Sequence, residues 1–216
     1  MGVFFRGGAE TIVKLVDKII SDRRQGHSNS MSDGPDLLDL LLLAVDNEGE
    51  SFTDQEIKEH ALTFVLAGSE TTGNLMVWIF YILMTHDHVL KACQQEIDQV
   101  IPNNIDELTN EHLSKLVICE AIINETLRLY PSAPIFIRRC IHGHTIVHLF
   151  AYLPFAAGPR NCIGQNFALL EAKIILAMFV QHCHFKLVTG QKIIPEVKIT
   201  LRTKYGLSAN TTKRQI

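Results

Sequence analysis

Apolar residues recur at helical spacing along the first half of the chain, with short polar breaks between them. Residues 10–24 place aliphatic side chains three and four positions apart, which predicts an amphipathic helix. A shorter Leu-rich helix is expected over residues 36–46, after a polar loop rich in Ser, Asp and Gly. Residues 10–50 are therefore predicted to contain the helices that precede the longest helix of the chain.

The longest helix is predicted over residues 53–85. Thr53 and Glu56 form a capping box, in which each side chain satisfies the backbone amide of the other residue. The apolar pattern that follows contains no proline before Pro102. At 1.5 Å per residue this helix is roughly 45 Å long, which is enough to cross a whole domain.

Two shorter helices follow the long one. Asp87 is expected to cap a helix over residues 88–101, which Pro102 closes. Another helix is predicted over residues 113–130, where Pro131 stops it. Proline marks both ends because it cannot continue an α-helix.

A last helix is predicted directly after Cys162. The residues that step by three or four positions and predict it are Ile163, Phe167, Leu170, Ile174 and Met178. Together with the preceding loop this element covers residues 153–182. In residues 183–216, short stretches of alternating apolar and polar residues are interrupted by Gly and Pro, so this region is expected to form small strands and turns. The fold class is therefore mainly α with a minor β part.

Composition limits the class of protein and its partners. The chain has 216 residues, 47% of them hydrophobic, which fits one globular domain or one lobe of a larger one. The formal charge of -3 gives no basic excess, so no nucleic-acid partner is expected. No run of about 18 apolar residues occurs, so no membrane span is expected in this chain. Five cysteines without a C-x-x-C spacing favour a reducing compartment over a zinc site or a disulfide framework.

The strongest candidate chemistry lies around Cys162, in the sequence LPFAAGPRNCIGQNFALLEAK. The cysteine precedes the predicted helix, and the N–H groups and partial positive charge of a first helical turn stabilise a thiolate. Gly158 and Gly164 let the backbone approach a flat ligand or turn sharply. Taken alone, a single cysteine in a glycine loop is most often a buried structural thiol.

The spacing of five residues in this loop changes that interpretation. Phe155-x-x-Gly158-x-Arg160-x-Cys162-x-Gly164 resembles the haem-binding signature of the cytochromes P450 at every fixed position. The resemblance implies that Cys162 is the thiolate ligand of the iron in haem b, whose electron donation favours O–O cleavage. It also implies that Arg160 contacts a haem propionate, that Phe155 lies beside the sulfur, and that the two glycines belong to the cofactor site.

The middle of the long helix contains poor helix formers. Gly, Ser and Thr interrupt its apolar pattern in LAGSETTGN, which by itself indicates either a tolerated kink or a functional site. The letters AGSETT are similar to the oxygen-binding segment of the P450 family. The resemblance implies that Ala67 and Gly68 lie over the distal haem face, and that Glu70 and Thr71 relay protons to bound oxygen.

Glu125 and Arg128 are a third constellation, three residues apart on one face of the helix predicted over 113–130. Alone, such a pair is most often a solvated surface ion pair. Its frame, ETLRLYPSAP, resembles the P450 E-x-x-R helix, in which the two charges form a buried structural pair. Arg138 and Arg139 follow the prolines that end this helix. The resemblance makes Arg138, and also Arg139, a candidate for cofactor binding through a haem propionate.

The resemblance covers most of this chain but only the C-terminal, helix-rich half of a family member, with details closest to the eukaryotic microsomal type. Between Arg139 and Phe155 the family has several dozen further residues, including an arginine that completes a buried triad with Glu125 and Arg128. Buried ions need full partnering. We therefore expect this pair to be under-satisfied or exposed, and the cysteine loop to have fewer anchors.

Two functions follow from these patterns. The first is a haem-thiolate monooxygenase that inserts one oxygen atom of O2 into an apolar organic substrate, with electrons from an NADPH-dependent P450 reductase. The second is a non-catalytic, truncated remnant of the family that binds haem weakly or not at all. For location, the resemblance implies the cytosolic face of the endoplasmic reticulum membrane, and the lack of an anchor in this chain predicts a cytoplasmic or peripheral protein.

Overall fold

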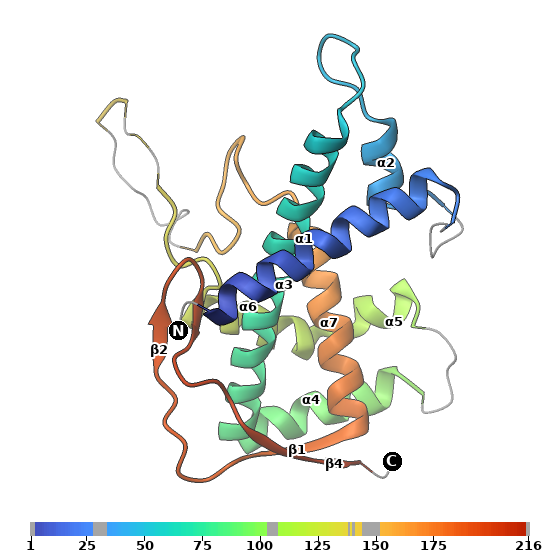
Figure 1. The fold of residues 1–216 in the computed structure, drawn as a ribbon. Helices are drawn as coiled ribbons and strands as arrows, with labels where there is room; N and C mark the ends of the chain where they lie inside the picture. Colours follow the sequence, from blue (N-terminus) through green and yellow to red (C-terminus); the bar gives the residue numbers. More distant parts are fainter. Residues whose placement is uncertain are drawn as a thin grey trace. The chain divides into compact units, whose positions relative to one another are not determined.

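The computed structural model describes residues 3–27, 34–102, 108–137, 139, 141–143 and 152–214. The chain forms two compact units, Met1–Gly68 and Ser69–Ile216, and the boundary between them falls inside the longest helix, α3 (Asp54–Thr85). Figure 1 shows that helices make up most of the chain and that the strands come last in the sequence. None of the helices in the described ranges combines the length and the hydrophobicity that a bilayer crossing needs.

The first unit is helical, as predicted. It contains α1 (Val3–Arg24), α2 (Leu37–Leu43) and the beginning of α3. α1 begins earlier than the periodicity predicted, and α2 is shorter. The buried aliphatic side chains that hold these helices together are Val16, Ile20 and Ile57.

The predicted capping box at the start of α3 is confirmed. The backbone N–H of Thr53 donates to Oε2 of Glu56 (2.8 Å), and the N–H of Glu56 donates to Oγ1 of Thr53 (3.3 Å). α3 stays helical through residues 66–74, where Gly and Thr interrupt the apolar pattern. A Cβ added at Gly68 or Gly73 would meet no described atom within 4 Å, so both glycines border open space.

An ion-pair cluster joins the end of α1 to the start of α2. The Arg23 guanidinium donates twice to the carboxylate of Asp36, at 3.0 and 2.8 Å, and also donates to Asp39. Asp36 is at the same time the N-cap of α2 and accepts the backbone N–H groups of Leu38 and Asp39. These hydrogen bonds, that of Arg23 first, lower the pKa of Asp36 to about 2.

The Arg23–Asp36 pair predicts a pH-dependent contribution to stability. An Asp36→Asn variant keeps a capping oxygen but loses the charge. Because folding lowers the pKa of Asp36, its stabilisation is present above the unfolded value of about 3.9 and is lost as the pH falls toward about 2. Thermal unfolding should show the wild type melting above the variant at neutral pH, with the two melting temperatures converging in acid. A difference that stays constant across this range would contradict the prediction.

The second unit continues α3 with further helices, which are α4 (Asp87–Val100), α5 (Asn110–Lys115), α6 (Val117–Leu129) and α7 (Gln165–His182). The expectation that Asp87 caps α4 is wrong. The N-cap is His86, and Asp87 is the first helical residue, where its charge complements the positive end of the helix.

The region predicted as one helix over 113–130 is divided between α5 and α6. Leu116 separates them with a non-helical ψ of 72°. The Glu96 carboxylate on α4 accepts the backbone N–H groups of Ile118 and Cys119, at 2.7 and 2.9 Å, and so caps the first turn of α6. The break is thus stabilised by a residue of another helix.

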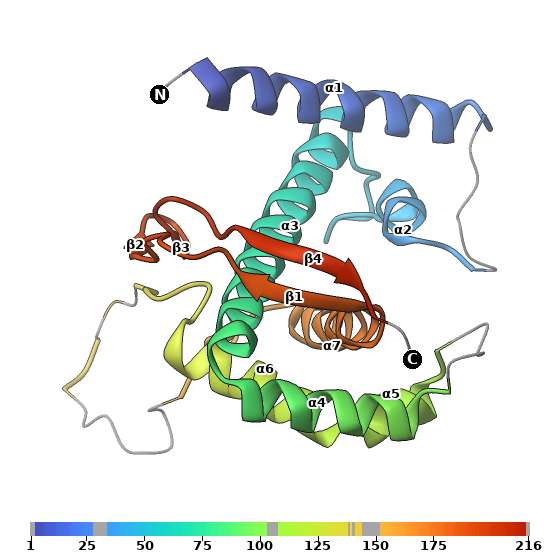
Figure 2. The same ribbon diagram turned by 90° about the horizontal axis from the view of Figure 1, so that it is seen from below.

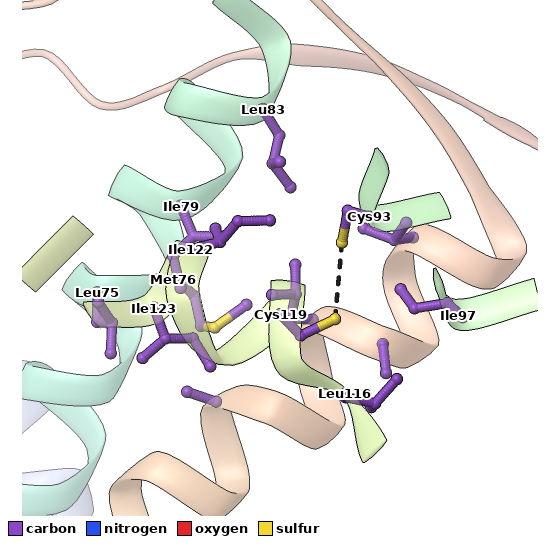
Figure 3. Packing of buried hydrophobic residues seen from close by; sticks show 14 of the residues in the cluster. Leu75, Met76, Ile79, Leu83, Cys93, Ile97, Leu116, Cys119, Ile122 and Ile123 are labelled. Atoms are coloured by element: carbon purple, nitrogen blue, oxygen red, sulfur yellow. Dashed lines mark hydrogen bonds between the residues drawn. The ribbon is translucent and has the colours of Figure 1, made fainter. Parts of the chain in front are cut away.

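The core of the second unit forms where α7 packs against α4 and α6, together with residues of α3. Figure 2 shows α7 with α4 and α6 on one side and the strands β1 (Cys183–Leu187) and β4 (Ala209–Lys213) on the other. Two free thiols meet in this core, with the sulfurs of Cys93 and Cys119 3.7 Å apart (Figure 3). The contact with Cys93 and burial raise the pKa of the Cys119 thiol, which therefore stays protonated at neutral pH.

The minor β part consists of two short antiparallel pairs within the described residues. β1 (Cys183–Leu187) pairs with β4 (Ala209–Lys213), and β2 (Pro195–Val197) pairs with β3 (Leu201–Thr203). The predicted fold class, mainly α with a minor β part, is confirmed.

Candidate functional site

The candidate site is built around the loop that leads into α7. The backbone N–H of Cys162 donates to the carbonyl of Phe155 (2.9 Å), and that of Asn161 donates to the carbonyl of Gly158 (3.0 Å). Gly158 has a φ of 80°, and Ala156 has a φ of 58°, a left-handed conformation that is costly for a residue with a Cβ. The loop folds back on itself and holds the cysteine at a defined place before the helix.

The thiol of Cys162 is free and exposed. α7 begins three residues later, and its N-cap is Gly164, which has no side chain to occupy the first-turn amides. A Cβ added at Gly164 would lie 3.9 Å from the Cys162 sulfur. Glycine therefore keeps this side of the thiol open to an approaching ligand.

Helix α7 has two apolar faces, and they have different surroundings. One face is buried in the core through Ala172, Leu176, Ala177 and Val180. The stripe from which the helix was predicted lies mainly outside the core. Phe167, on the other face of α7, is 71% exposed, and Ile163, in the loop just before the helix, is 88% exposed. An apolar surface therefore begins next to Cys162 and continues along α7. Exposure of such large apolar side chains together often marks a binding surface.

Glu70 and Thr71 lie on α3 and are contacted by two later segments of the second unit. The hydroxyl of Thr200, between β2 and β3, donates to Oε1 of Glu70 (2.7 Å). The hydroxyl of Ser132, just after α6, donates to the backbone carbonyl of Thr71 (2.9 Å). The segment that was predicted to relay protons is thus fixed by polar contacts from outside its own helix.

The Glu125–Arg128 pair is exposed, as we expected from the gap before Phe155. The two side chains are 54% and 58% exposed and form two hydrogen bonds, at 2.7 and 2.6 Å. The contact lowers the pKa of Glu125 and raises that of Arg128. In this chain the pair is a surface ion pair on α6.

Tyr152 is a residue that sequence reasoning missed. Its hydroxyl donates to the backbone carbonyl of Asn124 on α6 (3.0 Å) and so ties the beginning of the cysteine loop to the helix that carries Glu125. Burial, followed by the negative charge of Glu125, raises the pKa of Tyr152. Phe155 adds a second anchor, because it packs against the core of the unit.

The other predicted site residues are less closely connected to the cysteine. Arg160 is exposed and makes no ion pair with a described residue. Arg139 is exposed as well, and Arg138 lies outside the described residues. Ala67 and Gly68 are exposed and belong to the first unit, whereas Cys162 belongs to the second.

Comparison with known proteins shows the family to which this chain belongs. The family model described as Cytochrome P450 matches residues 5–148 and 142–207. The chain belongs to the cytochrome P450 family. Human "Cytochrome P450 4V2" is 33% identical to it over 223 residues, which cover 82% of this P450 chain and 42% of the human protein.

More distant relatives show the same relationship. The Bacillus subtilis (strain 168) "Bifunctional cytochrome P450/NADPH--P450 reductase 2" is 29% identical over 92% of this chain and 22% of its own length. Among solved structures, "Crystal structure of a Cytochrome P450 (CYP102L1)" matches with a TM-score of 0.81 and 26% identity, covering 99% of this chain and 58% of that one. This P450 chain thus spans less than two thirds of the length of each of these relatives.

The comparison also locates an internal difference from the family. An alignment over 223 residues that covers only 82% of a 216-residue chain contains positions at which this P450 has no residue. The two matches to the family model overlap at residues 142–148. This is the region between Arg139 and Phe155, in which the sequence predicts a missing segment.

The exposed ion pair on α6 predicts a small effect of mutation. Arg128→Ala should change the melting temperature by less than about 2 °C, because solvent screens exposed charges and the side chains lose entropy when they pair. The matched control is Arg214→Ala, since Arg214 is 13% exposed and pairs with Asp98 at 2.9 and 2.5 Å. Differential scanning fluorimetry should show the larger loss for the control. A large loss for Arg128→Ala would mean that the pair is structural.

Proposed function

We propose that this P450 chain is the haem-binding part of a monooxygenase that inserts one oxygen atom of O2 into an apolar organic substrate. The observation that carries the proposal is the free, exposed thiol of Cys162 at the start of the apolar surface on α7. A flat apolar macrocycle with a central iron needs an axial ligand and an apolar wall from the protein, and this arrangement offers both. When bound, haem b supplies the oxygen chemistry.

The cysteine loop provides the groups that would hold the haem. Cys162 offers its sulfur as the iron ligand, and Phe155 offers an apolar ring at the base of the loop. Gly158 and Gly164 let the backbone approach a flat ring, because neither carries a side chain that would fill the space beside the thiol. The exposed guanidinium of Arg160 is available to a haem propionate.

Residues outside the loop complete the proposed site. Glu70 and Thr71 are proposed to supply protons toward the distal haem face, because a carboxyl group and a hydroxyl group can each accept and donate a proton. Ala67 and Gly68 are proposed to lie over the distal haem face, on the resemblance of AGSETT to the oxygen-binding segment of the family. Arg138 is proposed as a second contact for a propionate.

The proposed partners are an apolar small-molecule substrate and an NADPH-dependent reductase. The reductase is supported by the Bacillus subtilis relatives, whose names join a P450 and an NADPH–P450 reductase in a single protein. For location we propose the cytosolic face of the endoplasmic reticulum membrane, on the resemblance to the microsomal type.

Thiolate ligation can be tested by absorption spectroscopy. The purified chain is loaded with haem, reduced and exposed to carbon monoxide. We expect the strongly red-shifted Soret band that thiolate ligation gives, and we expect Cys162→Ser to abolish it. Cys183→Ser is the matched control, because Cys183 is a second free cysteine at the other end of α7 and should leave the band unchanged.

Two outcomes would contradict the proposal. If the wild type binds haem but shows only the band of a nitrogen-ligated haem, Cys162 is not the ligand. If the wild type takes up no haem at all, the chain is the non-catalytic alternative.

A further inference from the structure

Thr200 connects the C-terminal strands to the acidic residue of the oxygen-binding segment. It lies in the turn between β2 and β3 and is 4% exposed. Its hydroxyl donates to Oε1 of Glu70 at 2.7 Å, and the amide Nδ2 of Asn74 donates to the same hydroxyl oxygen at 3.1 Å. Glu70 and Asn74 are four residues apart, so both face Thr200 from one side of α3.

The two contacts determine the direction of the hydrogen bonds. A threonine hydroxyl carries one proton and also accepts. Because the amide of Asn74 donates to the Thr200 oxygen, the hydroxyl proton of Thr200 is available for Glu70. Each bond in such a chain polarises the next, which strengthens the contact to the carboxylate.

The backbone around Thr200 is held by buried partners, which makes the contact a fixed one. The N–H of Leu201 donates to the carbonyl of Ser132 (2.9 Å), and the indole N–H of Trp78 donates to the carbonyl of Leu201 (3.2 Å). Trp78 is fully buried and stacks on Tyr130, with ring centroids 4.1 Å apart. The same Ser132 donates to the carbonyl of Thr71, so the turn and the oxygen-binding segment share an anchor.

We propose that Thr200 is a positioning residue that sets the orientation of the Glu70 carboxylate, with Asn74 directing its hydroxyl. This inference rests on the proposed function for the role of Glu70 in proton transfer. Within the described residues Thr200 is the hydrogen-bond partner of Glu70, and it occupies one of the two carboxylate oxygens. The other oxygen is left for a proton donor at the distal side of the site.

The contact can be measured without haem. Infrared spectra of the chain with 13C-labelled glutamate, with Glu70→Gln subtracted to isolate the Glu70 band, report the hydrogen bonding of this carboxylate. Thr200→Val keeps the shape of the side chain but removes the hydroxyl, and should shift the band. Thr200→Ser keeps the hydroxyl and should restore it. Thr203→Val is the matched control, because Thr203 is a buried threonine of the same hairpin and should leave the band in place.

A double-mutant cycle gives an independent readout. Thr200→Val should lower the melting temperature by about 2–4 °C in the wild type. The loss should be clearly smaller in a Glu70→Ala background, where only the bond from Asn74 remains to be lost. Thr203→Val should cost the same in both backgrounds.

The results separate this inference from the proposed function. An unchanged Glu70 band in Thr200→Val, or equal losses in the two backgrounds, would overturn the positioning role even if the chain binds haem through Cys162. Failure of haem binding would overturn the proposed function and leave the measured coupling between Thr200 and Glu70 unaffected.

Discussion

The second unit depends on the burial of one face of α7. Leu176 and Val180 are fully enclosed, and each such side chain contributes about 1.5–3 kcal/mol. Ala172 on the same face is small enough to let neighbouring helices come close. Because this face is committed to the core, Phe167 on the opposite face lies at the surface, and Ile163, in the loop that holds the cysteine, is exposed as well. The proposed haem surface is thus a consequence of how the helix packs.

The polar contacts around the site differ in what they fix. The Glu125–Arg128 pair is exposed, so solvent screens it and it holds little in place. The contact between Thr200 and Glu70 is different. Thr200 is buried, and the backbone N–H of the next residue, Leu201, donates to the carbonyl of Ser132. Tyr152 connects the cysteine loop to α6 by donating to a backbone carbonyl, and this contact is exposed to solvent. Hydrogen bonds between segments far apart in the sequence, more than the local ion pair, therefore connect the described parts of the site.

The sequence predicts those features that depend on local order. The helices over 10–24 and 53–85 follow from periodicity and a capping box, and the family follows from the spacing around Cys162. It could not predict the break at Leu116, because that break depends on a carboxylate from another helix. The contact of Thr200 joins residues 130 positions apart and leaves no local pattern. On α7 both faces are apolar, so composition alone could not tell the buried one from the exposed one.

The central claim is that haem covers the apolar surface that begins at Cys162. Hydrogen–deuterium exchange of the chain with and without haem tests it most directly, because a bound ring slows exchange in the backbone it covers. We predict that protection on haem addition is concentrated in residues 155–170 and is lost in Cys162→Ser. Haem binding that leaves these amides unprotected, or protects another part of the chain instead, would contradict the claim.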